Sequence, residues 1–110
     1  MGQALQQHDV YQAIADPSRR RLLRLLTQGE QPLSALASQF DMSRPAVSKH
    51  LRVLREAGLV TERRAGRETR YAFRPEPLAE LKDWLAYFEQ FWDNKLAMLR
   101  HLVEEEDNAK

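Results

Sequence analysis

Residues Met42–Val60 read MSRPAVSKHLRVLREAGLV, and their pattern sets the architecture of the chain. At 3.6 residues per turn, Val47, Leu51 and Leu54 fall on one face of a helix. The opposite face carries cationic and short hydroxyl side chains, namely Arg44, Ser48, Lys49, Arg52 and Arg55. The pattern predicts a helix that packs with one face and presents a basic face to solvent.

Both ends of this helix carry residues that favour helix termini. Ser43 is a candidate N-cap, Pro45 fits the first turn because its missing N–H costs nothing there, and Gly58 is a natural terminator. A short helix with Arg, Lys and Ser on its solvent face fits the major groove of DNA, where it can hydrogen-bond base edges and phosphates. The alternative, for this segment taken alone, is an ordinary solvated surface helix.

The residues immediately before this helix favour the first reading. We expect Ser34 to cap a short helix Ala35–Phe40, and Asp41–Ser43 to form a tight connection. A short helix, a turn and a longer basic helix over residues 34–58 make a helix-turn-helix, in which the first helix braces the second in the groove.

Two more helices are predicted nearer the N-terminus. The first runs from Gln7 to Ala15, within a dimer-associated segment 1–15, and it is short enough to need docking partners. Asp16-Pro17 then gives an acidic cap and a first-turn proline for a second helix, Ser18–Gln28.

The second helix ends at Gly29, and Glu30–Pro32 is expected to be a loop. Arg19, Arg20 and Arg21 are consecutive, so they fan around the helix. We interpret them as solvated surface charges, and the alternative is that Arg19 or Arg20 pairs with the acidic C-terminal part or touches a phosphate.

Past Gly58 the pattern changes to a period of two. Leu59–Arg64 and Thr69–Phe73 are predicted strands of a β-hairpin whose loop is Ala65–Glu68. Within the hairpin, residues 59–74, the loop and its flanks carry Arg63, Arg64, Arg67 and Arg70. A basic hairpin directly after a recognition helix is typical of a wing, which touches the DNA backbone or minor groove. The alternative is an edge hairpin that uses charge to block aggregation.

A long C-terminal helix follows the break at Pro75-Glu76-Pro77, in a segment 77–105 that is helical from about Leu78 to Glu105. Its apolar residues recur every three or four positions, and a helix of ~28 residues spans ~42 Å, more than a small domain can cover. We therefore expect a homodimer through the terminal helices. The alternative is a small-molecule pocket. Both hypotheses use the same residues: Trp84, Tyr87, Phe88, Phe91, Trp92, Leu96 and Leu99.

Composition narrows the function classes. The 110 residues hold 17 Lys and Arg against 16 Asp and Glu, but residues 1–75 sum to +6 and residues 76–110 to −5. A basic N-terminal part suits nucleic acid. No cysteine is present, and no apolar run reaches the ~20 residues of a membrane span, so we expect a single-domain cytoplasmic protein without membrane contact. No residue grouping suggests an enzyme or a cofactor site.

Three of these segments resemble one family together. They are Asp16–Leu23, Ser43–Val60 and Arg64–Tyr71, and they look like the ArsR/SmtB family of bacterial winged-helix repressors. The resemblance implies a fold of four helices, two strands and a last helix. It also implies a homodimer that binds double-stranded operator DNA and represses transcription by excluding polymerase.

The resemblance supports one set of DNA-contacting residues. On the helix these are Ser43, Arg44, Pro45, Ala46, Ser48, Lys49, Arg52 and Arg55, and on the wing Arg63, Arg64, Arg67 and Arg70. Many members of the family sense metals through cysteines, or through Asp-x-His and His-x-x-Glu on the last helix. Here His101 and Glu104 keep the second spacing, but Phe88 and Gln90 stand at the first. We therefore expect no metal site, as in the autorepressor-type branch, whose members often have no identified inducer.

A protein-binding winged-helix module is the alternative function. Its interface would normally be anchored by aromatic residues, whereas the run Ser43–Lys49 is small and polar.

Overall fold

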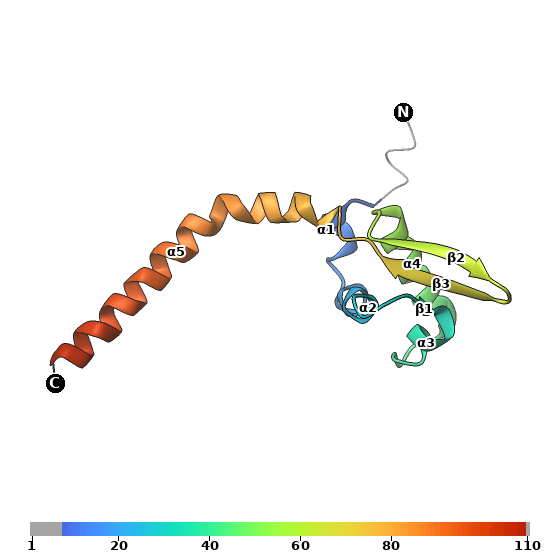
Figure 1. Ribbon diagram of the computed structural model, residues 1–110, viewed down its shortest axis with the longest axis horizontal. Coiled ribbons are helices and arrows are strands. Elements are labelled where there is room, and N and C mark those ends of the chain that lie inside the picture. Colours follow the sequence, from blue (N-terminus) through green and yellow to red (C-terminus); the bar gives the residue numbers. More distant parts are fainter. Residues whose placement is uncertain (1–7, 110) are drawn as a thin grey trace, which may run out of the picture. The chain divides into compact units, whose positions relative to one another are not determined.

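The computed structural model describes residues 8–109, except for the side chains of residues 93–97 and 106–109 (Figure 1). The chain divides into two units, Met1–Ala79 and Glu80–Lys110. The first contains helices α1 (Val10–Ala13), α2 (Pro17–Leu26), α3 (Leu33–Ala37) and α4 (Arg44–Glu56), and strands β1 (Gln31–Pro32), β2 (Val60–Ala65) and β3 (Glu68–Phe73). The second is formed by α5, Leu78–Ala109, which begins two residues earlier.

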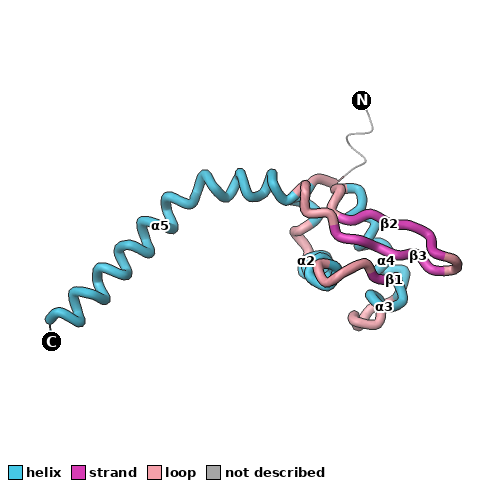
Figure 2. The backbone as a smooth tube through the Cα atoms, viewed as in Figure 1, coloured by secondary structure: helices cyan, strands magenta, loops and turns pink. Residues whose placement is uncertain are grey.

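The first unit has a winged helix-turn-helix fold, as predicted. Its core joins residues of α1, α2, α3 and α4 to the start of β2 and to Tyr71 of β3. The buried residues are Val10, Ala13, Leu22, Leu23, Leu26, Leu36, Val47, Leu51, Leu54, Leu59, Val60 and Tyr71. Figure 2 shows the β2–β3 hairpin beside α4 with its tip extending beyond the helices of this unit.

A third strand corrects the predicted loop at Glu30–Pro32. β1 pairs antiparallel with β3, so the sheet order is β1-β3-β2, with Gln31 opposite Tyr71 and Pro32 opposite Arg70. Two residues are too few to show a period of two in the sequence, and proline is tolerated because β1 lies at the sheet edge. The strand fixes the residue before it, Glu30, next to the hairpin.

The hairpin itself matches its prediction to within a residue or two. Val60 pairs with Phe73 and Ala65 with Glu68, so Gly66 and Arg67 form the turn. Gly66 has a φ of 66°, the left-handed region that this tight turn uses and that glycine adopts without strain.

The limits of four predicted helices were wrong, and α2 runs from Pro17 to Leu26 instead of from Ser18 to Gln28. α1 is shorter because Asp9 and Gln12 form a capping box that starts it at Val10, whereas Gln7 lies outside the described residues. α3 begins at Leu33 with Pro32 as its N-cap and without a side-chain cap, so Ser34 lies inside the helix. α5 continues past Glu105 to Ala109.

Candidate DNA-binding surface

Helix α4 is anchored by one face and exposed on the other. Ser43 caps it, with its hydroxyl oxygen accepting from the backbone N–H of Ala46 at 3.3 Å. Val47, Leu51 and Leu54 are completely buried and fix the rotation of the helix about its axis. The opposite side is solvent-accessible: Ser43, Arg44, Pro45, Lys49, Arg52 and Arg55 are exposed, and Ala46 and Ser48 are half-buried.

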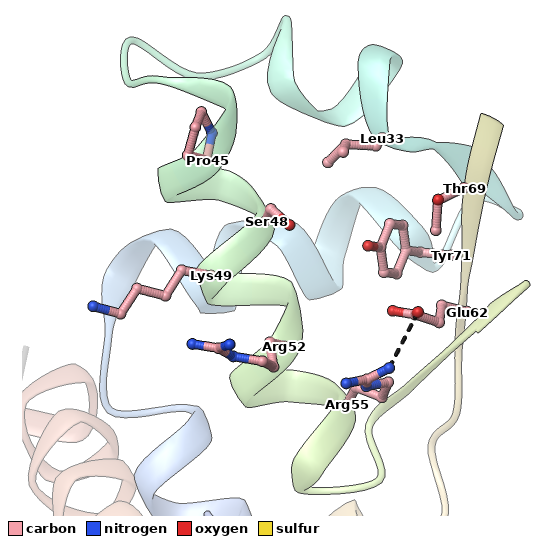
Figure 3. Close-up of a pocket in the computed structure, with 9 residues that line it drawn as sticks. All are labelled: Leu33, Pro45, Ser48, Lys49, Arg52, Arg55, Glu62, Thr69 and Tyr71. Atoms are coloured by element: carbon pink, nitrogen blue, oxygen red, sulfur yellow. Dashed lines mark ion pairs between the residues drawn. The ribbon is translucent and has the colours of Figure 1, made fainter. Parts of the chain in front are cut away.

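A groove of about 600 Å³ separates this face of α4 from the hairpin. Figure 3 shows Tyr71 and Glu62 reaching from the hairpin toward α4. Arg55 Nη1 lies 3.1 Å from Glu62 Oε2, which ties the last turn of α4 to β2. The groove is lined by Leu33, Pro45, Ser48, Lys49, Arg52, Arg55, Glu62, Thr69 and Tyr71. Recognition helix and wing thus form one continuous surface.

The sequence reading did not include Tyr71 and Glu62 among the site residues. Burial raises the pKa of the Tyr71 hydroxyl, and the negative charge of Glu62 raises it further. A side-chain hydrogen bond between the hydroxyl and Glu62 raises this pKa as well, so the phenol is engaged with a carboxylate that lines the same groove. The alternation of strand residues indicated that Tyr71 would pack, but a buried ring with its hydroxyl in a groove could not be read from that alternation.

The four wing arginines fall into two pairs. Arg63 and Arg70 are cross-strand neighbours, and strand alternation puts them on the sheet face opposite that of Glu62 and Tyr71. Arg64 shares the groove-side face and donates to Thr69 Oγ1 at 3.3 Å, while the exposed Arg67 lies in the turn. Arg64 and Arg67 also line a smaller hollow of about 260 Å³ together with Arg44 of α4.

The other pair is bound to a carboxylate. Arg63 donates to both Glu30 carboxylate oxygens, at 2.8 and 2.7 Å, and Arg70 Nε donates to Glu30 Oε1 at 3.0 Å. Arg70 also lies 3.3 Å from Glu68. The hydrogen bonds from Arg63 and Arg70 hold the pKa of Glu30 below its usual value, and Glu30 raises the pKa of Arg63. Glu30 was not identified from the sequence.

Comparisons with known proteins give the family. A helix-turn-helix domain family matches residues 14–63. The transcriptional repressor SdpR of Bacillus subtilis is 33% identical over 81% of this chain and 99% of its own. The transcriptional regulator Rv2034 of Mycobacterium tuberculosis is 38% identical over 87% of each chain. A crystal structure of an ArsR family transcriptional regulator, RHA00566, matches with a TM-score of 0.69 at 36% identity, over 76% of this chain and 86% of that one.

The chain belongs to the ArsR family. A second solved structure, an ArsR-like regulator from Rhodococcus sp. RHA1, covers 87% of this chain and 88% of its own, at 33% identity and a TM-score of 0.67. This ArsR-family chain is a DNA-binding transcriptional regulator of the winged helix-turn-helix class, as its relatives are, and not an enzyme.

The arginines at the start of α2 have structural contacts that the sequence reading did not predict. Arg19 donates to the backbone oxygens of Ala13 and Gln12, and Arg20 to that of Ile14, so both satisfy carbonyls at the end of α1. The guanidinium of Arg21 stacks 4.6 Å from the ring centre of Phe40. Arg20 and Arg21 are exposed, as predicted, whereas Arg19 is half-buried.

Asp16 connects α2 to the recognition helix of this ArsR-family fold. Its carboxylate accepts from the backbone N–H groups of Ser18 and Arg19 at 2.8 and 3.1 Å, and lies 4.0 Å from His50 of α4. Burial pushes the pKa of Asp16 up, but these hydrogen bonds and the nearby cations outweigh it and leave the pKa lowered.

Most of the aromatic residues predicted on the last helix are exposed on α5. Trp84, Tyr87, Phe91, Trp92 and Leu99 are between 50% and 69% exposed, and Phe88 is half-buried. The Phe88 ring lies 4.9 Å from that of Trp84 and 5.0 Å from that of Tyr87. Leu96, also predicted here, lies outside the residues whose side chains are described. The exposed residues form the apolar stripe of α5.

Two further observations concern metals and membranes. Among the described residues, no three His, Asp or Glu side chains come together in a group that could hold a metal ion. Within the same part of the chain, every helix is too short or too polar to cross a membrane.

Proposed function

We propose that this protein is a homodimeric repressor that binds an inverted-repeat operator through α4 and the wing, and that it does not sense metals. The observation that carries the proposal is the basic face of α4, held in one orientation by three completely buried residues, Val47, Leu51 and Leu54. A helix fixed in rotation can present the same side chains to successive base pairs, which sequence reading requires.

The contacts divide by chemistry between α4 and the wing. Lys49 and Arg52 are exposed on the middle of α4 and suit bidentate or single hydrogen bonds to guanine. Ser43, Arg44, Pro45, Ala46 and Ser48 form the N-terminal turns that approach the bases or the flanking phosphates. On the wing, Arg64 and Arg67 are the cations best presented to phosphates. Arg55 acts indirectly, since it is paired with Glu62.

The dimer part of the proposal draws on the apolar stripe of α5. Contiguous exposed apolar surface of this kind marks an interaction site in soluble proteins. A second copy of the chain is the simplest cover, because two α5 helices related by a two-fold axis present the same stripe to each other. Two recognition helices about 34–36 Å apart then match half-sites one helical turn apart.

The effector part draws on the donor chemistry. The sequence holds no cysteine, so thiolate metal sensing is unavailable to it. His101 and Glu105 of α5 pair only with each other among the described residues, at 3.6 Å. An organic small molecule is the inducer class that we propose, and a pocket for it at the apolar stripe is the alternative to the dimer interface.

Selection of bound sequences from a random duplex pool tests the proposal. At about 150 mM salt, loose charge-driven binding is suppressed, and we expect enrichment of an inverted repeat with half-sites about ten base pairs apart or a multiple of that. Failure to enrich any sequence, with only weak salt-sensitive binding, would reject it in favour of a protein-binding module.

Two substitutions test the division of contacts on the selected operator. Arg52→Ala should cost about 1–3 kcal/mol and relax the base preference at one position, whereas Arg67→Ala should weaken all sequences alike and reduce the salt slope by about 0.9. Equal losses on operator and random DNA for both variants would contradict this division.

A further inference from the structure

Glu30 binds two arginines that a DNA-binding wing would otherwise present to phosphates. Its two carboxylate oxygens accept three hydrogen bonds, two from Arg63 and one from Arg70, between 2.7 and 3.0 Å. Arg63 and Arg70 are directly opposite each other in the β2–β3 register, where two like charges repel. The carboxylate between them removes that repulsion.

The contact is long-range and depends on the third strand. Glu30 directly precedes β1, and β1 pairs with β3 at Pro32 and Arg70. This pairing fixes the carboxylate beside the hairpin face that carries Arg63 and Arg70. The Glu30 carboxylate does not reach Arg64 or Arg67, because Arg64 lies on the groove side of the sheet and Arg67 lies in the turn.

The wing arginines therefore fall into a pair whose charge is neutralised by carboxylates and a pair whose charge is not. With Glu68 beside Arg70, two arginines and two carboxylates form a neutral group on one face. Among the side chains that the structure describes, no carboxylate forms an ion pair with Arg64 or Arg67. The unpaired cations of the wing thus lie beside Arg44 of α4, in the hollow that all three line.

We propose that Glu30 determines DNA specificity by neutralising Arg63 and Arg70, which confines the phosphate contacts of the wing to Arg64 and Arg67. This rests on the proposed DNA-binding function. Phosphate contacts raise affinity for every sequence equally, and they supply nearly all non-specific binding. Because Glu30 keeps Arg63 and Arg70 away from phosphates, it lowers the affinity for non-operator DNA and so raises the ratio of operator to non-specific affinity.

Removal of the charge at Glu30 tests the inference. The measurement is the affinity for a random-sequence duplex between 50 and 200 mM salt, followed by fluorescence anisotropy. Each released phosphate contact steepens the slope of log affinity against log salt by about 0.9. Glu30→Gln frees one or two arginines, so its affinity should fall about 3- to 12-fold more than that of the wild type across this fourfold range. The ratio of operator to random affinity should fall as well.

Two matched variants separate this effect from simpler ones. Glu89→Gln changes the net charge equally at an exposed position of α5 and should leave the slope at the wild-type value. The triple variant Glu30→Gln, Arg63→Ala, Arg70→Ala should also return to that slope, because the arginines it lacks make no phosphate contact in the wild type.

Either of two results overturns the inference. One is a Glu30→Gln slope equal to that of the wild type. The other is a triple variant whose slope is shallower than that of the wild type by one contact or more, which would place Arg63 or Arg70 on phosphates already. Circular dichroism verifies folding, and the triple variant decides the question if Glu30→Gln does not fold. Loss of operator selection by the wild type would instead reject the proposed function, while the random-duplex slopes still test Glu30.

Discussion

Replacing Trp92 with alanine should dissociate the proposed homodimer. Trp92 lies in the apolar stripe of α5 and is 50% exposed. A tryptophan side chain buries roughly 200 Å² when fully covered, so about 100 Å² is left for a partner helix to cover. At about 25 cal/mol per Å² this corresponds to about 2.5 kcal/mol for each chain.

The two-fold symmetry of a homodimer doubles the effect. Each dimer loses the contact twice, so the upper value is about 5 kcal/mol, or more than a thousandfold in the dissociation constant. Buried area converts incompletely into affinity because association also costs translational and side-chain entropy. We therefore expect the dissociation constant to rise about 10²- to 10³-fold.

Sedimentation equilibrium over a wide range of protein concentrations measures this constant directly. Lys82→Ala is the matched control, since Lys82 is exposed on the same helix but is charged, and it should dimerise as the wild type does. Operator binding by Trp92→Ala should weaken in parallel with the loss of dimer, because half-sites are then bound singly. A Trp92→Ala protein that dimerises within twofold of the wild type would refute the reasoning.

Three further predictions concern stability. Leu51→Ala should lower the free energy of unfolding by about 2–5 kcal/mol in urea, because Leu51 is completely buried under α4, whereas Lys49→Ala on the exposed face should change it little. Asp16→Ala should cost about 1 kcal/mol by the same measurement through loss of the N-cap of α2, with Asp16→Asn close to wild type; an equal loss in both would point to its charge instead. Because the pKa of Glu30 is lowered in the folded state, its ion pairs stabilise the protein above the ordinary value of 4.5, and this contribution is lost as pH falls through the folded-state pKa. The stability difference between wild type and Glu30→Gln should therefore shrink in acid, and a difference that stays constant from pH 7 to pH 3 would contradict the role of the charge.

The features predictable from sequence were those set by local periodicity. Val47, Leu51 and Leu54 recur at helical spacing, and all three are buried as predicted. Terminal signals were equally informative where a side chain caps a helix, as Ser43 and Asp16 do. The prediction for α3 was wrong, because Ser34 was expected to be its N-cap. The helix begins earlier, at Leu33, with Pro32 as an N-cap residue in extended conformation and without a side-chain hydrogen bond.

The features that sequence could not supply come from contacts between different elements of the fold. Arg19 and Arg20 resemble any surface arginines in the sequence, and only the turn between α1 and α2 brings the carbonyls of Ala13 and Ile14 to them. For the apolar stripe of α5, the periodicity of the sequence predicts a packing surface, but it does not identify the partner that packs on it.

Arg63, Arg64, Arg67 and Arg70 contribute equally to the net charge of the wing, but the sheet places them in different surroundings. Arg63 and Arg64 are adjacent in sequence, yet strand alternation sends their side chains to opposite faces. On one face a carboxylate 33 residues earlier in the chain meets Arg63, and on the other Arg64 lies near Arg44 of the recognition helix. A two-residue strand decides this, because β1 is what holds Glu30 at the hairpin. It follows that the effective charge of a wing depends on its third strand, and that two chains with the same number of wing arginines can differ in how strongly they bind DNA of any sequence.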